Sequence, residues 1–378
     1  MAGDRPRAPE HIVWKKKAPR PKPEGGEPPR FARHTTFLVV AGLVVVLFGA
    51  WIATPRGKRS GSLAAKGVRP IALPEGSRAT ALAAGRDGLW VALEGPSAFL
   101  HVSYKPPHAV LARVDLDIPN PNLKGLAVAP DGSVWATLEA ANKIVKLEAA
   151  WPHATTVFDV PQKRALPGHI AAGSDGGMWF AQQGIPRLGR IGSSRPHALT
   201  ETLLPGTGKL PYANRATYGI ASAPDGLLWF TREFRRELCS FRPGALEEIR
   251  CRALALPRGT LPRDVAISPD GRVFFTLSTL HVGVWEPATG LRVLPVATTI
   301  GGAVAMTASA SGSVYVTGLR EIFQIESRDP GNIRALTLPT PFSRPTALAV
   351  APDGALYFVD GSGVTLGRFE PEGMKPPG

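Results

Sequence analysis

One phrase recurs seven times between residues 80 and 360: an apolar run, a tight turn that contains glycine, and a second run that opens near an aromatic residue. The turn glycines lie 41 to 50 residues apart and are Gly88, Gly132, Gly176, Gly226, Gly271, Gly312 and Gly354. A period in the forties made of short strands is typical of a β-propeller, in which each repeat is one four-stranded blade. The sequence therefore predicts an all-β fold, a closed ring of seven blades.

Each repeat contains four candidate strands. Residues 219–231 carry two β-rich runs on either side of Pro224-Asp225-Gly226, where proline presets φ and glycine accepts a positive φ, so the two runs form a hairpin. A third alternating run follows in each repeat, such as residues 143–147, and then a fourth, such as residues 156–161. The repeats have no long stretch with a helical period, so we expect no helix in the ring.

The seventh blade needs a strand from elsewhere in the chain. Its repeat ends at residues 367–373 without a convincing fourth strand, whereas residues 68–74 precede the first repeat and end in Leu-Pro, as other fourth strands do. An unpaired strand edge invites aggregation. We therefore predict that residues 68–74 pair with the third strand of blade seven. The propeller then spans residues 68–373, followed by a tail at 374–378.

The region before the ring has a different composition. Residues 1–35 are rich in proline and charge and carry too little apolar surface to fold alone, which predicts a disordered basic tail. Residues 36–54 form an apolar run without Asp, Glu, Lys or Arg. A helix of that length just spans a hydrocarbon core of about 30 Å, so we expect a transmembrane helix. Residues 55–67, rich in Gly, Ser and Ala, are predicted to be a flexible linker.

Two interpretations of the apolar run compete. A cleaved signal peptide has a short basic start and small residues at its cleavage site, whereas here the basic region is long and Trp51-Ile52-Ala53 follows the apolar core. These features favour a single-pass anchor in the cell membrane. Nine Lys and Arg residues precede the run and five follow it closely, which predicts a cytoplasmic N-terminus and an extracytoplasmic propeller.

Only two cysteines are present, Cys239 and Cys251, and they lie at equal distances from residue 245. If residue 245 belongs to the hairpin between the third and fourth strands of blade four, the cysteines face each other within reach of a disulfide. Cysteine is also commonly buried as a free thiol. The sequence is therefore consistent with a disulfide or with two buried thiols.

The repeats resemble the blades of the virginiamycin B lyase family. Residues 219–231 read Gly-Ile-Ala-Ser-Ala-Pro-Asp-Gly-Leu-Leu-Trp-Phe-Thr and residues 188–191 read Leu-Gly-Arg-Ile, similar to that family's G-I-T-x-G-P-D-G-x-L-W-F-T-E and I-G-R-I. The resemblance covers all seven repeats. It implies a seven-bladed propeller. Characterised members are lyases that linearise streptogramin B antibiotics by elimination across an ester bond, with Mg²⁺, a histidine base and glutamates.

The resemblance also implies where such a site would lie. The family's histidine stands seven positions before the turn aspartate and its glutamate seven positions after it, and a hairpin brings both near the axis. The histidine position here holds Thr80, Lys124, Gly168, Tyr218, Arg263, Val304 and Thr346. His169 lies one place later and Glu94 matches the glutamate position, so these two are the candidate catalytic residues. The alternative for His169 is a structural side chain at a strand start, either solvated or with its hydrogen bonds satisfied. No metal ligand set transfers, so we expect no required cofactor, and Mg²⁺ only if the lyase chemistry is retained.

The charge of the ring points to an anionic partner. The chain carries a net charge of +14, and residues 1–35 account for only a minor part of it. An arginine cluster around an axial opening attracts an anionic ligand or an acidic protein surface. The alternative is a solvated rim, partly neutralised by Glu233 and Glu237. Nucleic acid is not an expected partner of a ring outside the cytoplasm. The candidate ligand-binding residues are Lys209, Tyr218, Arg232, Arg235, Arg236 and Arg263.

Two functions remain open at this point. The first is a membrane-anchored binding or scaffold module for an anionic ligand or partner, favoured by the anchor, the basic rim and the altered catalytic positions. The second is a streptogramin B lyase-like enzyme, or another enzyme that cleaves an ester or lactone, with altered site residues.

Overall fold

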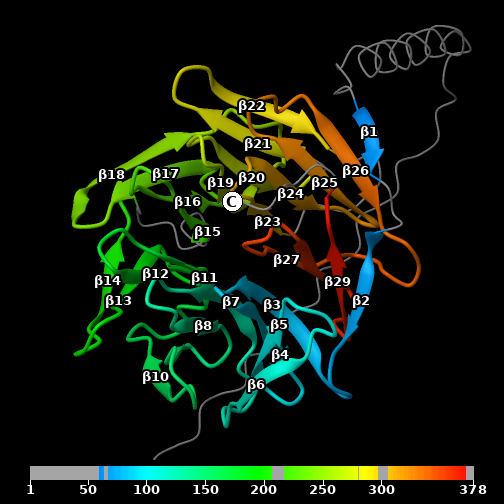
Figure 1. Ribbon diagram of the computed structural model, residues 1–378. Helices are drawn as coiled ribbons and strands as arrows, with labels where there is room; N and C mark the ends of the chain where they lie inside the picture. The colour runs from blue at the N-terminus through cyan, green and yellow to red at the C-terminus, as the bar shows by residue number, and fades with distance from the viewer. Residues whose placement is uncertain (1–58, 64–66, 207–216, 280, 297–304, 372–378) are drawn as a thin grey trace, which may run out of the picture. The chain divides into compact units, whose positions relative to one another are not determined.

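A computed structural model describes residues 59–63, 67–206, 217–279, 281–296 and 305–371 (Figure 1). The chain divides into two units, Met1–Pro55 and Arg56–Gly378. The predicted tail, the predicted transmembrane helix at 36–54 and the C-terminal tail at 374–378 lie outside the described residues. In the part that is described, no helix is long and apolar enough to cross a membrane.

The described part of the second unit forms seven sheets arranged around a centre, with the first strand of each sheet innermost (Figure 1). The prediction of an all-β, seven-bladed propeller is confirmed. Blades one to four consist of β3 (Arg78–Ala84), β4 (Gly88–Glu94), β5 (Ala98–Ser103), β6 (Val110–Asp115); β7 (Leu123–Val128), β8 (Val134–Leu138), β9 (Lys143–Leu147), β10 (Thr155–Asp159); β11 (Pro167–Ala172), β12 (Gly177–Gln182), β13 (Arg187–Gly192), β14 (Leu199–Leu203); β15 (Thr217–Ser222), β16 (Leu228–Arg232), β17 (Glu237–Arg242) and β18 (Ala245–Ala253).

The remaining three blades complete the ring. They consist of β19 (Pro262–Ile267), β20 (Val273–Leu277), β21 (His281–Glu286), β22 (Gly290–Pro295); β23 (Met306–Ala308), β24 (Ser313–Thr317), β25 (Glu321–Glu326), β26 (Ile333–Thr337); β27 (Ala347–Val350), β28 (Leu356–Val359) and β29 (Thr365–Phe369). Consecutive strands within each blade pair antiparallel, as the Asp-Gly hairpins require.

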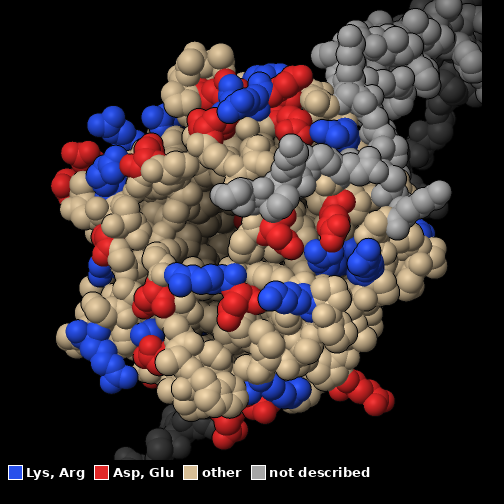
Figure 2. Space-filling view, in the orientation of Figure 1, with Lys and Arg blue, Asp and Glu red and all other residues tan. Residues whose placement is uncertain are grey.

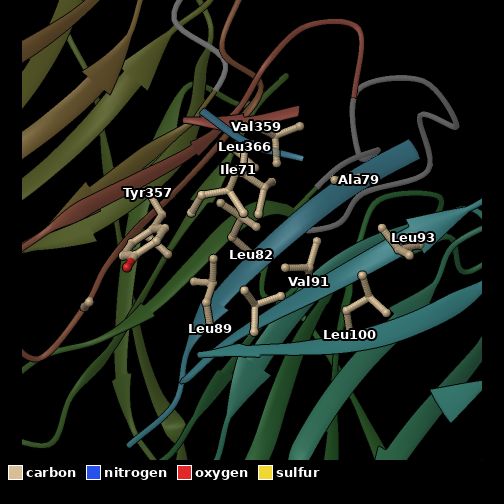
Figure 3. Close-up of a cluster of buried hydrophobic side chains, with 14 of the residues drawn as sticks. Ile71, Ala79, Leu82, Leu89, Val91, Leu93, Leu100, Tyr357, Val359 and Leu366 are labelled. Atoms are coloured by element: carbon tan, nitrogen blue, oxygen red, sulfur yellow. The ribbon is translucent and has the colours of Figure 1, made fainter. Parts of the chain in front are cut away.

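The ring closes with a strand from before the first repeat. β2 (Arg69–Ala72) pairs antiparallel with β29, with Ile71 opposite Leu366. The prediction that residues 68–74 complete blade seven is confirmed. Figure 3 shows this seam, where Ile71 and Leu366 lie beside Leu82 and Val91 of blade one. All four side chains are buried, so the closing strand is held by apolar packing as well as by its ladder.

The predicted linker at 55–67 is not wholly irregular. Residues Arg59–Leu63 form β1, which pairs in parallel with β26 and adds a fifth strand to blade six. β26 is the outermost of the four strands that the repeat itself supplies. Its outer backbone N–H and C=O groups can therefore pair with another extended segment. A segment of small residues carries no side-chain signal for such pairing, which is why its composition indicated a flexible linker.

Each blade fills its centre by matching the volumes of two cross-strand residues. Phe180 and Phe358 of the second strands lie opposite Gly189 and Gly367 of the third strands. A Cβ atom added to either glycine would stand 2.0 Å from the facing ring, so glycine is required there. Where the second strand has a smaller residue the third strand has a larger one, as in the pair of Val316 and Phe323. The glycine of the Leu-Gly-Arg-Ile run is therefore a packing residue.

Candidate functional site

The inner ends of the blades enclose an axial cavity. Its volume is about 260 Å³, and all seven blades contribute to its lining. Most of the lining residues are Ala, Gly, Leu, Ile or Val, and the ionisable side chains among them are Lys124, His169, Tyr218 and Asp264. Figure 2 shows a hollow at the centre of the ring with both basic and acidic side chains near its edge.

A repeated bulge at the start of the first strand positions these four side chains. In blades two to five, the ladder between the first and second strands is interrupted. At the interruption, two unpaired residues of the first strand lie opposite one residue of the second. In blade two the missing ladder contact is replaced by Thr137, whose hydroxyl accepts the N–H of Gly125 at 2.8 Å. Thr276 does the same for Asp264 in blade five, at 3.0 Å. The skipped residues include all four ionisable groups of the cavity.

The bulges bring together a histidine and an aspartate from two different blades. Nδ1 of His169 in blade three lies 3.2 Å from Oδ1 of Asp264 in blade five. The ring of Tyr218, from the blade between them, lies 5.4 Å from the His169 ring, centroid to centroid. The His169 side chain is 27% exposed, whereas that of Asp264 is 8% exposed. His169 is therefore open to the cavity, whereas the carboxyl group beside its Nδ1 is buried.

Asp264 is held firmly in place. Its Oδ1 accepts the N–H of Val265 and its Oδ2 accepts the N–H of Met306, both at 2.9 Å. Burial raises the pKa of Asp264, against the lowering effect of His169 and of these backbone hydrogen bonds. Because Met306 begins the first strand of blade six, Asp264 also ties two blades together. The geometry makes Asp264 a positioning group for the His169 ring.

Sequence reasoning missed Asp264, although a signal for it exists. The position directly after the family's histidine position holds Ala81, Gly125, His169, Gly219, Asp264, Ala305 and Ala347. Only two members of that set are polar, and these two meet. Between them, a Cβ on Gly219 would stand 2.7 Å from the backbone nitrogen of Val265, so the inner strands approach too closely for a larger residue.

The two candidate catalytic residues are not brought together. Glu94 lies at the end of β4, where its Oε2 accepts a hydrogen bond from Nη2 of Arg78 at 2.9 Å. It lines two neighbouring cavities and is absent from the lining of the axial one. His169 has Asp264 as its carboxyl neighbour instead.

The arginines of blade four are largely engaged with other parts of the same chain. Arg232 is buried, and its Nη1 donates to Oε2 of Glu237 at 2.9 Å and to the carbonyl of Pro205 at 3.0 Å. Burial lowers the pKa of Arg232, and Glu237 opposes that effect. Nε of Arg235 donates to the same carboxylate at 3.1 Å. Two of the candidate anion-binding residues thus share one internal acid.

The other candidate ligand-binding residues also have internal contacts. Arg236 donates to the carbonyls of Leu256 and Pro257. Nε of Arg263 donates to Oε1 of Glu233 at 2.9 Å, and its Cζ lies 5.8 Å from the centroid of the Tyr218 ring. Lys209 lies outside the described residues. Among the described cationic side chains of the axial cavity, Lys124 has no carboxylate within ion-pair distance.

The Mg²⁺ implied by the resemblance can be tested against the donors present. Among the described residues, the one group of three donor side chains close enough to share an ion is Glu237, Cys239 and Cys251. Both sulfurs of that group are joined in a disulfide. Mg²⁺ prefers oxygen ligands in octahedral geometry, and the axial cavity offers only the carboxylate of Asp264, which already accepts two backbone hydrogen bonds. The described residues therefore do not fit a Mg²⁺ site.

The cysteines lie opposite each other on β17 and β18 and form a disulfide. Cys239 is the register partner of Cys251, and their Cα atoms are 4.0 Å apart. Of the two alternatives that the sequence left open, the structure has the cross-link rather than two free thiols.

Comparisons with known proteins agree with this architecture. A search of curated proteins finds no match. Among solved structures, a streptogramin B lyase matches with a TM-score of 0.70 and 19% identity, over 82% of this chain and all of that chain. Virginiamycin B lyase from Staphylococcus aureus matches with a TM-score of 0.69 and 18% identity, over 80% of this chain and 98% of that one. YCF48 bound to a D1 peptide matches with a TM-score of 0.62 and 12% identity, over 84% and 99%.

At these identities the solved structures establish the fold alone. The model of the virginiamycin B lyase family, by contrast, matches residues 110–375, which is most of the ring. Together with the seven blades and the run at residues 188–191, this match places the chain: it belongs to the virginiamycin B lyase family.

Proposed function

We propose that this chain is a membrane-anchored, extracytoplasmic binding module whose axial cavity receives an anionic group of a ligand or partner. The observation that carries the proposal is Lys124, a cavity-lining cation without a described carboxylate partner. Beside it, the imidazole of His169 and the hydroxyl of Tyr218 add further polar contacts. A free ammonium in a partly enclosed cavity attracts an anion more strongly than one on an open surface, because fewer waters screen it.

The placement outside the cytoplasm rests on two independent features. The sequence has an apolar run at 36–54 with more basic residues before it than after it. The ring carries a disulfide between Cys239 and Cys251, and disulfides persist mainly in oxidising compartments. Both features support a propeller tethered at the outer face of a cell membrane.

A peptide is one ligand that a ring of this shape can hold. YCF48, a structural neighbour of this chain, was solved with a bound D1 peptide. A peptide's carboxylate, or the phosphate of a phosphorylated lipid or sugar, has the charge that Lys124 requires.

Calorimetric titration of the full chain with glycerol 3-phosphate tests the proposal. We expect saturable binding that Lys124→Gln weakens at least tenfold, because its ammonium has no described carboxylate within ion-pair distance and is left to pair with the anion. The matched control is Lys143→Gln, since Lys143 already pairs with Asp159. Equal affinity in the wild type and the Lys124 variant would rule out the axial cavity as the anion site.

A second candidate function is supported by the His169 and Asp264 pair. A buried carboxyl group beside Nδ1 orients an imidazole so that Nε2 can take a proton from a substrate or a water. The reaction class would be elimination or hydrolysis at an ester or lactone, without a metal. This alternative keeps His169 as the base, replaces Glu94 by Asp264 as its partner, and takes streptogramin B cyclic depsipeptides as its first test substrates.

A turnover assay with a streptogramin B substrate separates the two functions. If the chain is an enzyme, we expect activity in the presence of a chelator, abolished in His169→Ala and lowered about a hundredfold in Asp264→Asn. Glu94→Gln serves as the control and retains activity, since Glu94 does not line the axial cavity. Loss of activity on chelation, or full activity in His169→Ala, would contradict this mechanism.

A further inference from the structure

At the Asp-Gly turn end of the blades, a cation packs on an aromatic ring in a repeated arrangement. In four blades the aromatic residue of the second strand lies directly opposite a basic residue of the third strand. These pairs are Trp90 and His101, Trp135 and Lys146, Trp179 and Arg190, and Tyr357 and Arg368. The Cζ atom of Arg190, for example, lies 5.9 Å from the Trp179 ring centroid, within the range of a cation–π contact.

Each of these four basic side chains, the neutral or charged His101 included, has a carboxylate beside it. Nε2 of His101 lies 3.4 Å from Asp87 and Nζ of Lys146 lies 3.0 Å from Glu148. Nε of Arg190 lies 2.6 Å from Asp175, and Arg368 pairs with Glu370. In each of these four blades, the basic side chain on the aromatic ring therefore has an acidic neighbour in the same blade.

Blade four departs from this pattern. Its aromatic residue, Trp229, faces Ser240, and the cation comes instead from the fourth strand as Arg252. Cζ of Arg252 lies 5.7 Å from the Trp229 ring and 5.4 Å from the ring of Trp285 in blade five. No described carboxylate is within ion-pair distance of Arg252, and its Nη1 is buried without a hydrogen-bond partner among the described residues.

The guanidinium of Arg252 lines a cavity of about 480 Å³ between blades four and five. Arg242 and Arg250 line the same cavity, and Arg242 donates to the backbone carbonyl of Asp225 rather than to a carboxylate. Two acids, Asp225 and Glu248, also line it. Three arginines and two acids thus line the cavity. Nη1 of Arg252 makes no hydrogen bond to a described residue.

We infer that this cavity is an oxyanion-binding site, formed by Arg252 between Trp229 and Trp285, for a ligand that presents a carboxylate or phosphate group. A guanidinium offers a planar fork that fits either group in a bidentate manner. The two indole rings hold that fork in a fixed plane, so little side-chain entropy is lost when an anion arrives. The site is separate from the axial cavity, which shares none of its lining residues, and it does not depend on the function proposed there.

NMR of the indole N–H groups in the full chain tests the inference. Inorganic phosphate and, separately, acetate are titrated at constant ionic strength against chloride. We expect saturable shifts of the two indole signals assigned to Trp229 and Trp285 by Trp229→Phe and Trp285→Phe. Saturation by phosphate alone identifies a phosphoryl ligand, and saturation by acetate alone identifies a carboxylate. Shifts that grow linearly with both anions would overturn the site.

Variants of matched arginines complete the test. Arg252→Gln should weaken the saturating anion at least tenfold, and Arg252→Lys should weaken it less, because the charge remains and the fork is lost. Arg190→Gln should bind as the wild type does, since Arg190 is already closed by Asp175. Circular dichroism confirms that each variant is folded. Unchanged affinity in folded Arg252→Gln would refute the inference.

Discussion

Blades three and four have the same parts in different arrangements. In blade three Arg190 packs on Trp179 and forms an ion pair with Asp175. Asp175 also accepts a hydrogen bond from the Trp179 indole N–H at 3.1 Å. In blade four Arg252 packs against two tryptophans, and no described carboxylate lies within ion-pair distance of it. In the first arrangement the cation forms an ion pair with an acid of its own blade. The comparison separates this cation, which has an acid beside it, from the one at which we infer an anion site.

The largest expected difference between the two blades concerns their outer strands. Cys239 and Cys251 cross-link β17 and β18, whereas the corresponding positions of blade three hold Gly189 and Glu201. Replacing both cysteines by alanine should lower the free energy of unfolding by about 3 kcal/mol, because the unfolded chain loses a loop constraint. Urea unfolding measures it. Glu201→Ala removes only one hydrogen bond, from Gln182, and should cost about 1 kcal/mol. Equal losses of unfolding free energy in the double cysteine variant and in Glu201→Ala would contradict this difference between the two blades.

The next contrast concerns the arginines themselves. Arg190→Met leaves Asp175 without its main partner and should cost about 1–3 kcal/mol in the free energy of unfolding. Arg252→Met leaves no carboxylate behind and keeps the apolar stem between the two rings, so it should cost less than about 1 kcal/mol. Chemical denaturation of the two variants gives both numbers. A larger loss in Arg252→Met would mean that this arginine has a structural role instead.

The smallest expected effect is a pH dependence that the Arg190 pair of blade three has and the Arg252 arrangement of blade four lacks. Burial raises the pKa of Asp175, but hydrogen bonds from Arg190, Trp179 and Gly177 outweigh it and hold that pKa below its ordinary value of 3.8. Folding therefore gains stability from Asp175 above its ordinary pKa and loses it as the pH falls through the lowered value. Unfolding at about pH 5 and about pH 3 should show a smaller acid-induced loss in Asp175→Asn than in the wild type. Arg252→Gln should retain the wild-type loss, and a change there would contradict the contrast.

Local sequence patterns predicted the parts of the fold that depend on neighbouring strands. The equal spacing of Cys239 and Cys251 about residue 245 predicted that they could face each other, and they do, although the turn joins Arg242 to Ala245 and a register shift lies between it and the cysteines. The missing fourth strand of blade seven identified residues 68–74 as the closing strand. The strand at Arg59–Leu63 escaped prediction because its parallel pairing with β26 is long-range and is made by backbone groups.

The partners of charged side chains were predicted far less well. The sequence left open a free arginine cluster or a rim partly neutralised by Glu233 and Glu237, and the structure pairs Glu237 with Arg232 and Arg235, and Glu233 with Arg263. Glu94 matched its expected repeat position, yet it faces Arg78 rather than His169. A long, flexible charged side chain has several neighbours in reach, within its blade and across to the next, and a repeat pattern does not say which of them it pairs with.

By itself, the sequence determined a ring of seven four-stranded blades and its closing strand, because these follow from the period, the turn residues and the alternation of apolar residues. Only the tertiary structure decided that His169 meets Asp264, and that Arg252 lies between Trp229 and Trp285 without an acid. These contacts join different blades, so they depend on bulges at the inner strands and on the close approach of adjacent sheets, which no single repeat specifies.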